Sequence, residues 1–167
     1  MESPYSVLYK FSSNEILYWQ QLDQSKKSVT IYKGKVGELG ETIIFQDKLF
    51  SNSRKKLYKE FCKINANGYR ELVEEDYNYV IVEFDLKSND HDVNSQQYLE
   101  IKKFIENILV NTGLGFTIFD EFEMYNDGIL EVTCQVVNQN MTIEVLEKAL
   151  RNSKFSDYRK IYENDFR

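Results

Sequence analysis

The sequence is poor in the residues that most metal sites, disulfide frameworks and membrane spans require. Its 167 residues include one histidine, one proline and two cysteines. Cys62 and Cys134 lie far apart within apolar patterns, so we expect two buried free thiols in a reducing compartment rather than a disulfide. No run approaches the roughly 20 apolar residues of a membrane-spanning helix. Residues 1–4 lack the basic and apolar regions of a secretory signal, which favours a cytoplasmic location.

Sequence motifs that accompany catalysis are also missing. There is no nucleophile elbow, phosphate-binding loop or metalloprotease motif. Residues 112–116 contain a Gly-x-Gly core, but a strand rather than a helix is expected to follow, which is the wrong context for a dinucleotide. Asp90, His91 and Asp92 are adjacent loop residues that seldom converge on one ion. We therefore expect no metal, no cofactor and no enzymatic activity.

The residues that are abundant indicate a folded chain with two differently charged halves. Hydrophobic residues make up 42% and charged residues 29%, which suits one large or two small domains. Residues 1–73 hold 12 basic and 8 acidic residues, a net charge of +4, whereas residues 74–167 hold 9 and 19, a net charge of −10. The change of sign predicts two domains, residues 1–75 and 76–167. The basic half could meet an anion, and the acidic half would repel nucleic acid.

The first half is predicted to be a sheet covered by one helix. Four short alternating runs with polar connections predict an antiparallel β-meander over residues 5–11, 15–22, 29–33 and 42–45. Residues 54–66 change to helical period, with Leu57, Phe61 and Ile64 on one stripe that Tyr58 and Cys62 extend. Ser53 is expected to cap this helix, and Gly68 to end it.

Two blocks of this half resemble a known domain family. They are the glycine-rich block Tyr32 to Gly40 and the helix with Lys59-Glu60-Phe61 that closes on Asn67-Gly68-Tyr69-Arg70. Over about residues 5–75 the chain is similar to the WGR domain, a module of poly(ADP-ribose) polymerases and MolR-type bacterial proteins. In the polymerases, the Trp and Arg of a Trp-Gly-Arg triplet help to engage a DNA end.

That triplet falls here on Lys33-Gly34-Lys35, where only Gly34 matches fully. Lys35 keeps a charge without the planar fork of arginine, and Lys33 replaces the stacking ring. The resemblance implies a nucleic-acid surface built from these residues and the helix cations: Lys33, Gly34, Lys35, Arg54, Lys55, Lys59 and Lys63. The other interpretation is a WGR-like scaffold whose lysines are only solvated.

The second half is predicted to be a small α+β sandwich of ferredoxin-like type. Residues 79–86 alternate as a strand, residues 96–110 form a helix, and a strand-like run covers 116–124. A turn at 126–128, a strand over 129–137 and a helix opened by Thr142 follow. The order strand–helix–strand–strand–helix suggests this fold. An aromatic tail from Phe155 onward is expected to fold back, in one arrangement onto the other half.

Three functions remain open from the sequence. The first is a non-enzymatic binding or adaptor protein of bacterial type that recognises a macromolecular partner, expected to be a protein; an immunity or antitoxin-like role is one form of it. The second is nucleic-acid binding by the WGR-like basic surface. The third is a hydrolase or other enzyme using the acidic hairpin, since paired carboxylates can serve acid–base chemistry: Asp120, Glu121, Glu123 and Asp127.

Overall fold

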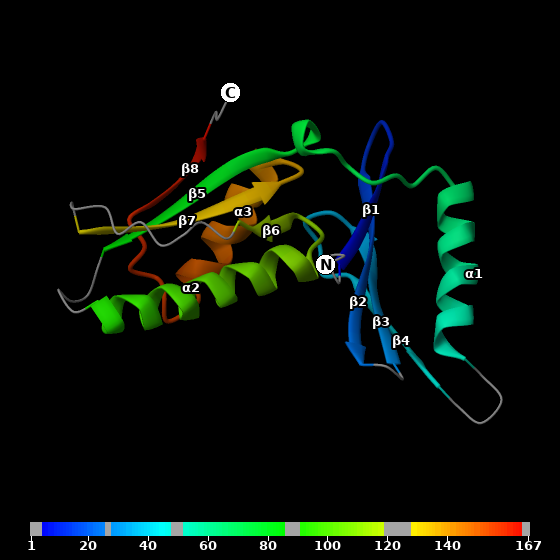
Figure 1. The fold of residues 1–167 in the computed structure, drawn as a ribbon. Helices are drawn as coiled ribbons and strands as arrows, with labels where there is room; N and C mark the ends of the chain where they lie inside the picture. Colours follow the sequence, from blue (N-terminus) through cyan, green and yellow to red (C-terminus); the bar gives the residue numbers. More distant parts are fainter. Residues whose placement is uncertain (1–4, 26–27, 48–51, 86–90, 119–127, 165–167) are drawn as a thin grey trace. The chain divides into compact units, whose positions relative to one another are not determined.

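The protein is an α+β chain that divides into two compact units. The structure, a computed structural model, describes residues 5–25, 28–47, 52–85, 91–118 and 128–164. The first unit comprises Met1–Val73 with Asn111–Gly113, and the second comprises Glu74–Val110 with Leu114–Arg167. Each unit contains one four-stranded antiparallel sheet, and the described residues form three α-helices (Figure 1). None of these helices is long and apolar enough to cross a membrane.

The sheet of the first unit is the meander that the alternating runs predict. Its strands lie in chain order: β1 (Tyr5–Phe11), β2 (Ile16–Ser25), β3 (Ser28–Lys35) and β4 (Glu41–Gln46). The first connection is a tight turn in which the Ser12 N–H donates to the Glu15 carbonyl oxygen over 3.0 Å. Each strand is within a few residues of its predicted bounds, because apolar side chains alternate with polar ones at the two-residue period of a strand.

Helix α1 (Ser53–Ala66) covers one face of this sheet. Ile64 is buried, and Leu57 and Phe61 are half-buried against a core of Leu8, Trp19 and Ile31. The Phe61 and Trp19 ring centroids lie 6.0 Å apart, a distance typical of aromatic pairs. The predicted stripe is therefore correct at its centre.

Both ends of α1 follow capping rules, although the N-cap is one residue earlier than expected. The Asn52 side chain, rather than Ser53, accepts from the Lys55 N–H over 3.1 Å. Gly68 follows the helix with φ of +84°, a conformation that costs glycine little. The predicted extension of the stripe is wrong: Tyr58 and Cys62 are both exposed, so Cys62 is not a core thiol.

The second unit packs two helices with a second sheet. Its elements are a 3₁₀ turn (Glu74–Asp76), β5 (Asn78–Asp85), α2 (His91–Asn111), β6 (Gly115–Thr117), β7 (Ile129–Val136), α3 (Gln139–Arg151) and β8 (Lys160–Asn164). The strand order is β6-β7-β5-β8, with every neighbouring pair antiparallel. Within the predicted aromatic tail, residues 160–164 form strand β8, which pairs with β5 of its own unit.

Two central strands form the core of the second unit. Residues 80–84 of β5 are all buried, and β7 buries alternate residues, including Cys134, as its pattern predicts. Helix α3 begins earlier than expected, because Asn138 caps it by accepting from the Met141 N–H over 3.0 Å. Thr142, expected to be the cap, is buried and donates its hydroxyl to the Asn138 carbonyl oxygen.

Candidate functional site

Lys33 and Lys35 lie at the end of β3, and each has an acidic neighbour. The Lys33 ammonium is 3.7 Å from a Glu41 carboxylate oxygen, and the Lys35 ammonium is 3.4 Å from that of Glu38. Pairs as exposed as these contribute little to stability. They do offset the positive charge locally, so the triplet offers an anionic ligand less attraction than its composition suggests.

The backbone of the glycine-rich turn is occupied within the first unit. The Gly37 N–H donates to the Thr112 carbonyl oxygen over 2.9 Å, and the Gly40 N–H donates to that of Asn111 over 3.1 Å. Backbone N–H groups of a glycine turn can cradle phosphate when they point into solvent. The Gly37 and Gly40 N–H groups already bond to carbonyl oxygens of the chain, so they do not point into solvent for a phosphate to bind.

Two glycines of this turn, Gly34 and Gly40, are required by packing. A Cβ on Gly40 would overlap the hydroxyl of Tyr18, and a Cβ on Gly34 would lie 3.0 Å from the Gly40 Cα. Tyr18 is fully buried and donates its hydroxyl to the Asn111 carbonyl oxygen over 2.8 Å. Burial raises the pKa of Tyr18 to about 12, which keeps the phenol neutral at physiological pH. Gly34 is therefore better explained by packing than by ligand binding.

The exposed cations of the first unit are concentrated on α1. Its solvent-facing residues include Arg54, Lys55, Lys56, Lys59 and Lys63, and its sequence contains one acidic residue. That residue, Glu60, lies 4.0 Å from the Lys63 ammonium. We call these five cations the α1 cation surface. Lys56 is exposed on the same helix, although the nucleic-acid set that the resemblance implies does not name it.

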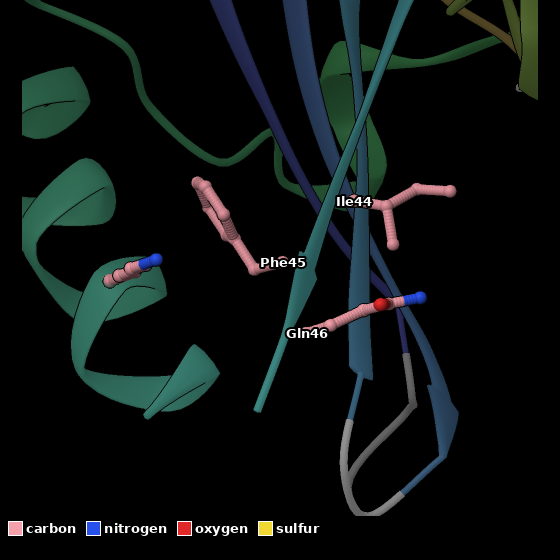
Figure 2. Close-up of a pocket in the computed structure, with 4 residues that line it drawn as sticks. Ile44, Phe45 and Gln46 are labelled. Atoms are coloured by element: carbon pink, nitrogen blue, oxygen red, sulfur yellow. The ribbon is translucent and has the colours of Figure 1, made fainter. Parts of the chain in front are cut away.

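Two shallow hollows flank α1, one on each side. A hollow of about 330 Å³ is lined by β2 and α1 residues: Gln21, Arg54, Leu57, Tyr58 and Phe61. On the other side, a hollow of about 380 Å³ is lined by Lys56 and three residues of β4. Figure 2 shows that Phe45 points toward α1, whereas Ile44 and Gln46 point away from it. The helix is therefore bordered by accessible space along both flanks.

One buried and one half-buried carboxylate of the second unit have structural partners. Glu83 on β5 is paired with Lys160 of β8 over 2.9 Å. A carboxylate oxygen of Glu106 accepts from both the N–H and the hydroxyl of Thr117. The described ranges contain no cluster of three metal-ligating side chains. These contacts tie neighbouring elements together. The Thr117 hydroxyl is a potential nucleophile beside a carboxylate, but it is buried.

Two of the predicted chemical features fall partly or wholly outside the described ranges. The acidic hairpin lies there entirely: Asp120, Glu121, Glu123 and Asp127. The second feature is the Asp90-His91-Asp92 cluster. Asp90 lies outside the described ranges, and His91, expected in a loop, is the first residue of α2. Of the predicted nucleic-acid residues, the structure brings Arg54, Lys55, Lys59 and Lys63 together on α1, and it places Lys33, Gly34 and Lys35 on β3.

Comparison with protein-family models, curated proteins and solved structures returned no match to this chain. The WGR and ferredoxin-like assignments therefore stay predictions.

Proposed function

We propose that this chain is a non-enzymatic binding or adaptor protein that recognises an acidic protein partner through the α1 cation surface. In this proposal the first unit is a WGR-like module and the second is ferredoxin-like. The observed order β–α–β–β–α–β, with strands arranged β6-β7-β5-β8, is the order of that second fold and supports the assignment. Fold does not determine function, so the proposal depends on the surface.

The observation that carries the proposal is the concentration of five cations on one helix of a chain with net charge −6. Charges of one sign gathered on a single surface steer association with a partner of opposite charge. The same helix exposes Tyr58, whose side chain is 69% accessible, beside the hollow on the β2 side. Tyrosine and arginine are among the residue types enriched at the energetic centres of protein interfaces.

Affinity capture from the cell of origin tests this proposal. The tagged chain is compared with Lys55→Glu plus Lys59→Glu, two exposed changes on α1, by quantitative mass spectrometry. We expect one or a few acidic proteins to be captured by the unmodified chain and depleted at least about tenfold by the variant, since each tenfold step needs only about 1.4 kcal/mol. Isothermal titration with the purified partner then measures the same loss.

A matched control separates this surface from net charge. Lys103→Glu plus Lys148→Glu makes the same charge change on exposed positions of α2 and α3. Capture should survive this change. Equal capture by all three proteins would exclude the α1 cation surface as the recognition site, and equal loss with both variants would reduce the effect to non-specific charge.

Nucleic-acid binding is the second candidate, and the same five cations favour it. Lysine and arginine side chains along a helix can follow a phosphate backbone, and binding then weakens steeply with salt. Titration of nicked and blunt duplexes at two salt concentrations, with the unmodified chain, Lys55→Glu plus Lys59→Glu, and Lys33→Glu plus Lys35→Glu, tests it. Salt-sensitive binding that the helix variant weakens more than the triplet variant would favour this candidate over the protein partner.

A further inference from the structure

The two edge strands of the first sheet, β1 and β4, differ in whether another segment of the described chain bonds to their outer side. At one edge, β1 is bridged by the chain after α1: the Tyr9 N–H donates to the Arg70 carbonyl oxygen over 2.8 Å, and the Arg70 N–H donates back over 2.9 Å. At the other edge, no strand in the described ranges pairs with the outer side of β4. An unpaired edge offers a row of donors and acceptors to another chain.

The register shows which groups of β4 point outward. The N–H of Val36, the residue after β3, donates to the Ile16 carbonyl oxygen over 2.8 Å, so the even-numbered residues of β3 bond to β2. Successive residues of a strand bond to opposite neighbours, so Lys33, Ile31 and Val29 bond to β4. Their partners are Glu41, Ile43 and Phe45. The backbone groups left facing outward therefore belong to the intervening residues: Thr42, Ile44 and Gln46.

Several devices that protect a strand edge are missing from β4, whose only charged residue is Glu41 at its start. It has six residues, no proline, no lysine and no register shift against β3. Ile44, in its middle, is 56% exposed. The edges of the second sheet are shorter, since β6 has three residues and β8 has five. Of these edges, β4 is therefore the most favourable for strand addition.

The positive charge of α1 beside this edge favours an added strand that carries acidic residues. Helix α1 packs over β3 and β4, and Lys56 lies in the hollow beside residues 44–46. Lys56, Lys59 and Lys63 are spaced by three and four residues and so share one side of the helix. An added strand would place alternate side chains on this basic side and the others beside Ile44.

We propose that the open edge of β4 binds an extended segment of a protein partner by strand addition. The segment alternates acidic residues, which face Lys56 and its neighbours on α1, with apolar residues, which pack beside Ile44. Main-chain hydrogen bonds to Thr42, Ile44 and Gln46 provide affinity, and the alternating side chains provide specificity. This inference rests on the proposed function and specifies the partner's chemistry.

A labelled peptide of alternating glutamate and valine tests this edge, with a lysine–valine peptide as the charge control. We expect saturable binding of the glutamate peptide, and binding of the lysine peptide at least about tenfold weaker. In amide NMR spectra, the N–H groups of Thr42, Ile44 and Gln46 should shift and gain protection from exchange, whereas those of Ile43 and Phe45 should change little.

Two substitutions at one position separate the backbone from the side chain. Ile44→Pro removes an outward N–H without removing a bond to β3, and proline is tolerated on an edge strand. Ile44→Thr keeps the N–H. We expect Ile44→Pro to weaken peptide binding at least about tenfold and Ile44→Thr to leave most of it. Fluorescence of Trp19, in the core beneath α1, checks that the first unit stays folded.

A pair of charge changes covers the case in which Ile44→Pro does not fold. Lys56→Glu plus Lys63→Glu should abolish the preference for glutamate over lysine, while Lys103→Glu plus Lys148→Glu should preserve it. Absence of saturable binding, equal binding of both peptides, or unchanged binding by Ile44→Pro would overturn the inference. Dimerisation of the free chain that Ile44→Pro abolishes would overturn it as well, by assigning the edge to a second copy.

The outcome also distinguishes this inference from the function on which it rests. If the Lys55 and Lys59 reversals remove the captured partner but Ile44→Pro does not, the function stands and strand addition fails. If neither variant changes capture, both fail. If both variants remove the captured partner, that partner binds to α1 and to the edge of β4 at the same time.

Discussion

Helices α1 and α3 have nearly the same length and the same kind of cap, yet they are held very differently. They span 14 and 13 residues, and each begins after an asparagine whose side chain accepts from a backbone N–H. Helix α3 buries Thr142, Leu146 and Leu150, whereas α1 buries only Ser53 and Ile64. Burial of an apolar face supplies most of the stability of a helix in a protein. Helix α1 buries fewer residues than α3, so its packing stabilises it less and more of its surface is exposed to solvent. The less buried helix is the one that carries the candidate binding surface.

The two cysteines offer the most sensitive comparison of the units. Cys62 is exposed on α1, and Cys134 is buried on β7, where burial raises the pKa of its thiol. Reaction with a thiol reagent such as DTNB at pH 8 should modify Cys62 rapidly. Cys134 should react at least about 10³-fold more slowly, because it needs an opening of the second unit. Single Cys→Ser variants assign each phase, and similar rates would mean that the core around β7 is open.

Truncation of one apolar side chain on each helix measures the difference in packing. Leu146→Ala, at a fully buried position of α3, should lower the free energy of unfolding by about 3–5 kcal/mol. Phe61→Ala, at a half-buried position of α1, should cost about 2 kcal/mol, below the range for a buried phenylalanine. Urea denaturation measures both, and fluorescence of Trp19, the only tryptophan, follows the first unit. Leu99→Ala, 59% exposed on α2, is the control. Equal losses for Phe61 and Leu146 would refute the comparison.

The stability of the chain at alkaline pH tests the burial of Tyr18, which lies on the face of the first sheet opposite α1. Burial raises its pKa to about 12 from the ordinary value of 10.0. The unfolded chain ionises first, so the stabilisation is complete below pH 10 and is lost as pH rises toward 12. Two pKa units correspond to about 2–3 kcal/mol. Stability against pH should fall more steeply for the unmodified chain than for Tyr18→Phe; parallel curves would contradict the enclosure of this phenol.

The surface ion pairs beside the glycine-rich turn should contribute least. Lys33→Ala plus Lys35→Ala removes two exposed pairs, with Glu41 and with Glu38. The free energy of unfolding should change by no more than about 1 kcal/mol, and added salt should shrink the difference. Thermal unfolding at low and high salt measures this. A larger, salt-insensitive loss would show that these lysines support the hairpin through packing.

Most helices and strands could be predicted because apolar residues recur in them at a clear helical or strand period. The predictions that failed concern features that depend on tertiary contacts. Alternation located β1 to β5 and β7, and the Leu57, Phe61 and Ile64 stripe located α1. Strand β8 was missed because Ile161 and Tyr162 form a short pattern that becomes a strand only by pairing with β5. Cys62 was misplaced because a helical stripe drawn from sequence has no defined width, and α1 covers its sheet along a narrow contact.

The candidate site was less predictable than the fold. The sequence pointed to the glycine-rich block, where Gly40 makes room for Tyr18, and the nucleic-acid set that the resemblance implies names four of the five α1 cations. Nothing in the sequence marks the edge of β4 as open. Whether an edge is paired depends on distant segments, such as the Arg70 bridge on β1, and short-range patterns do not record it.

The Arg70 bridge limits how far copies of this chain could associate through the first sheet. A sheet with two free sides can polymerise without end, since each added copy exposes a fresh side. With one side occupied, joining through the remaining side yields a pair and then stops. The Arg70 segment occupies the backbone groups of Tyr9 in the middle of β1, so a copy that added at this edge would first have to displace it.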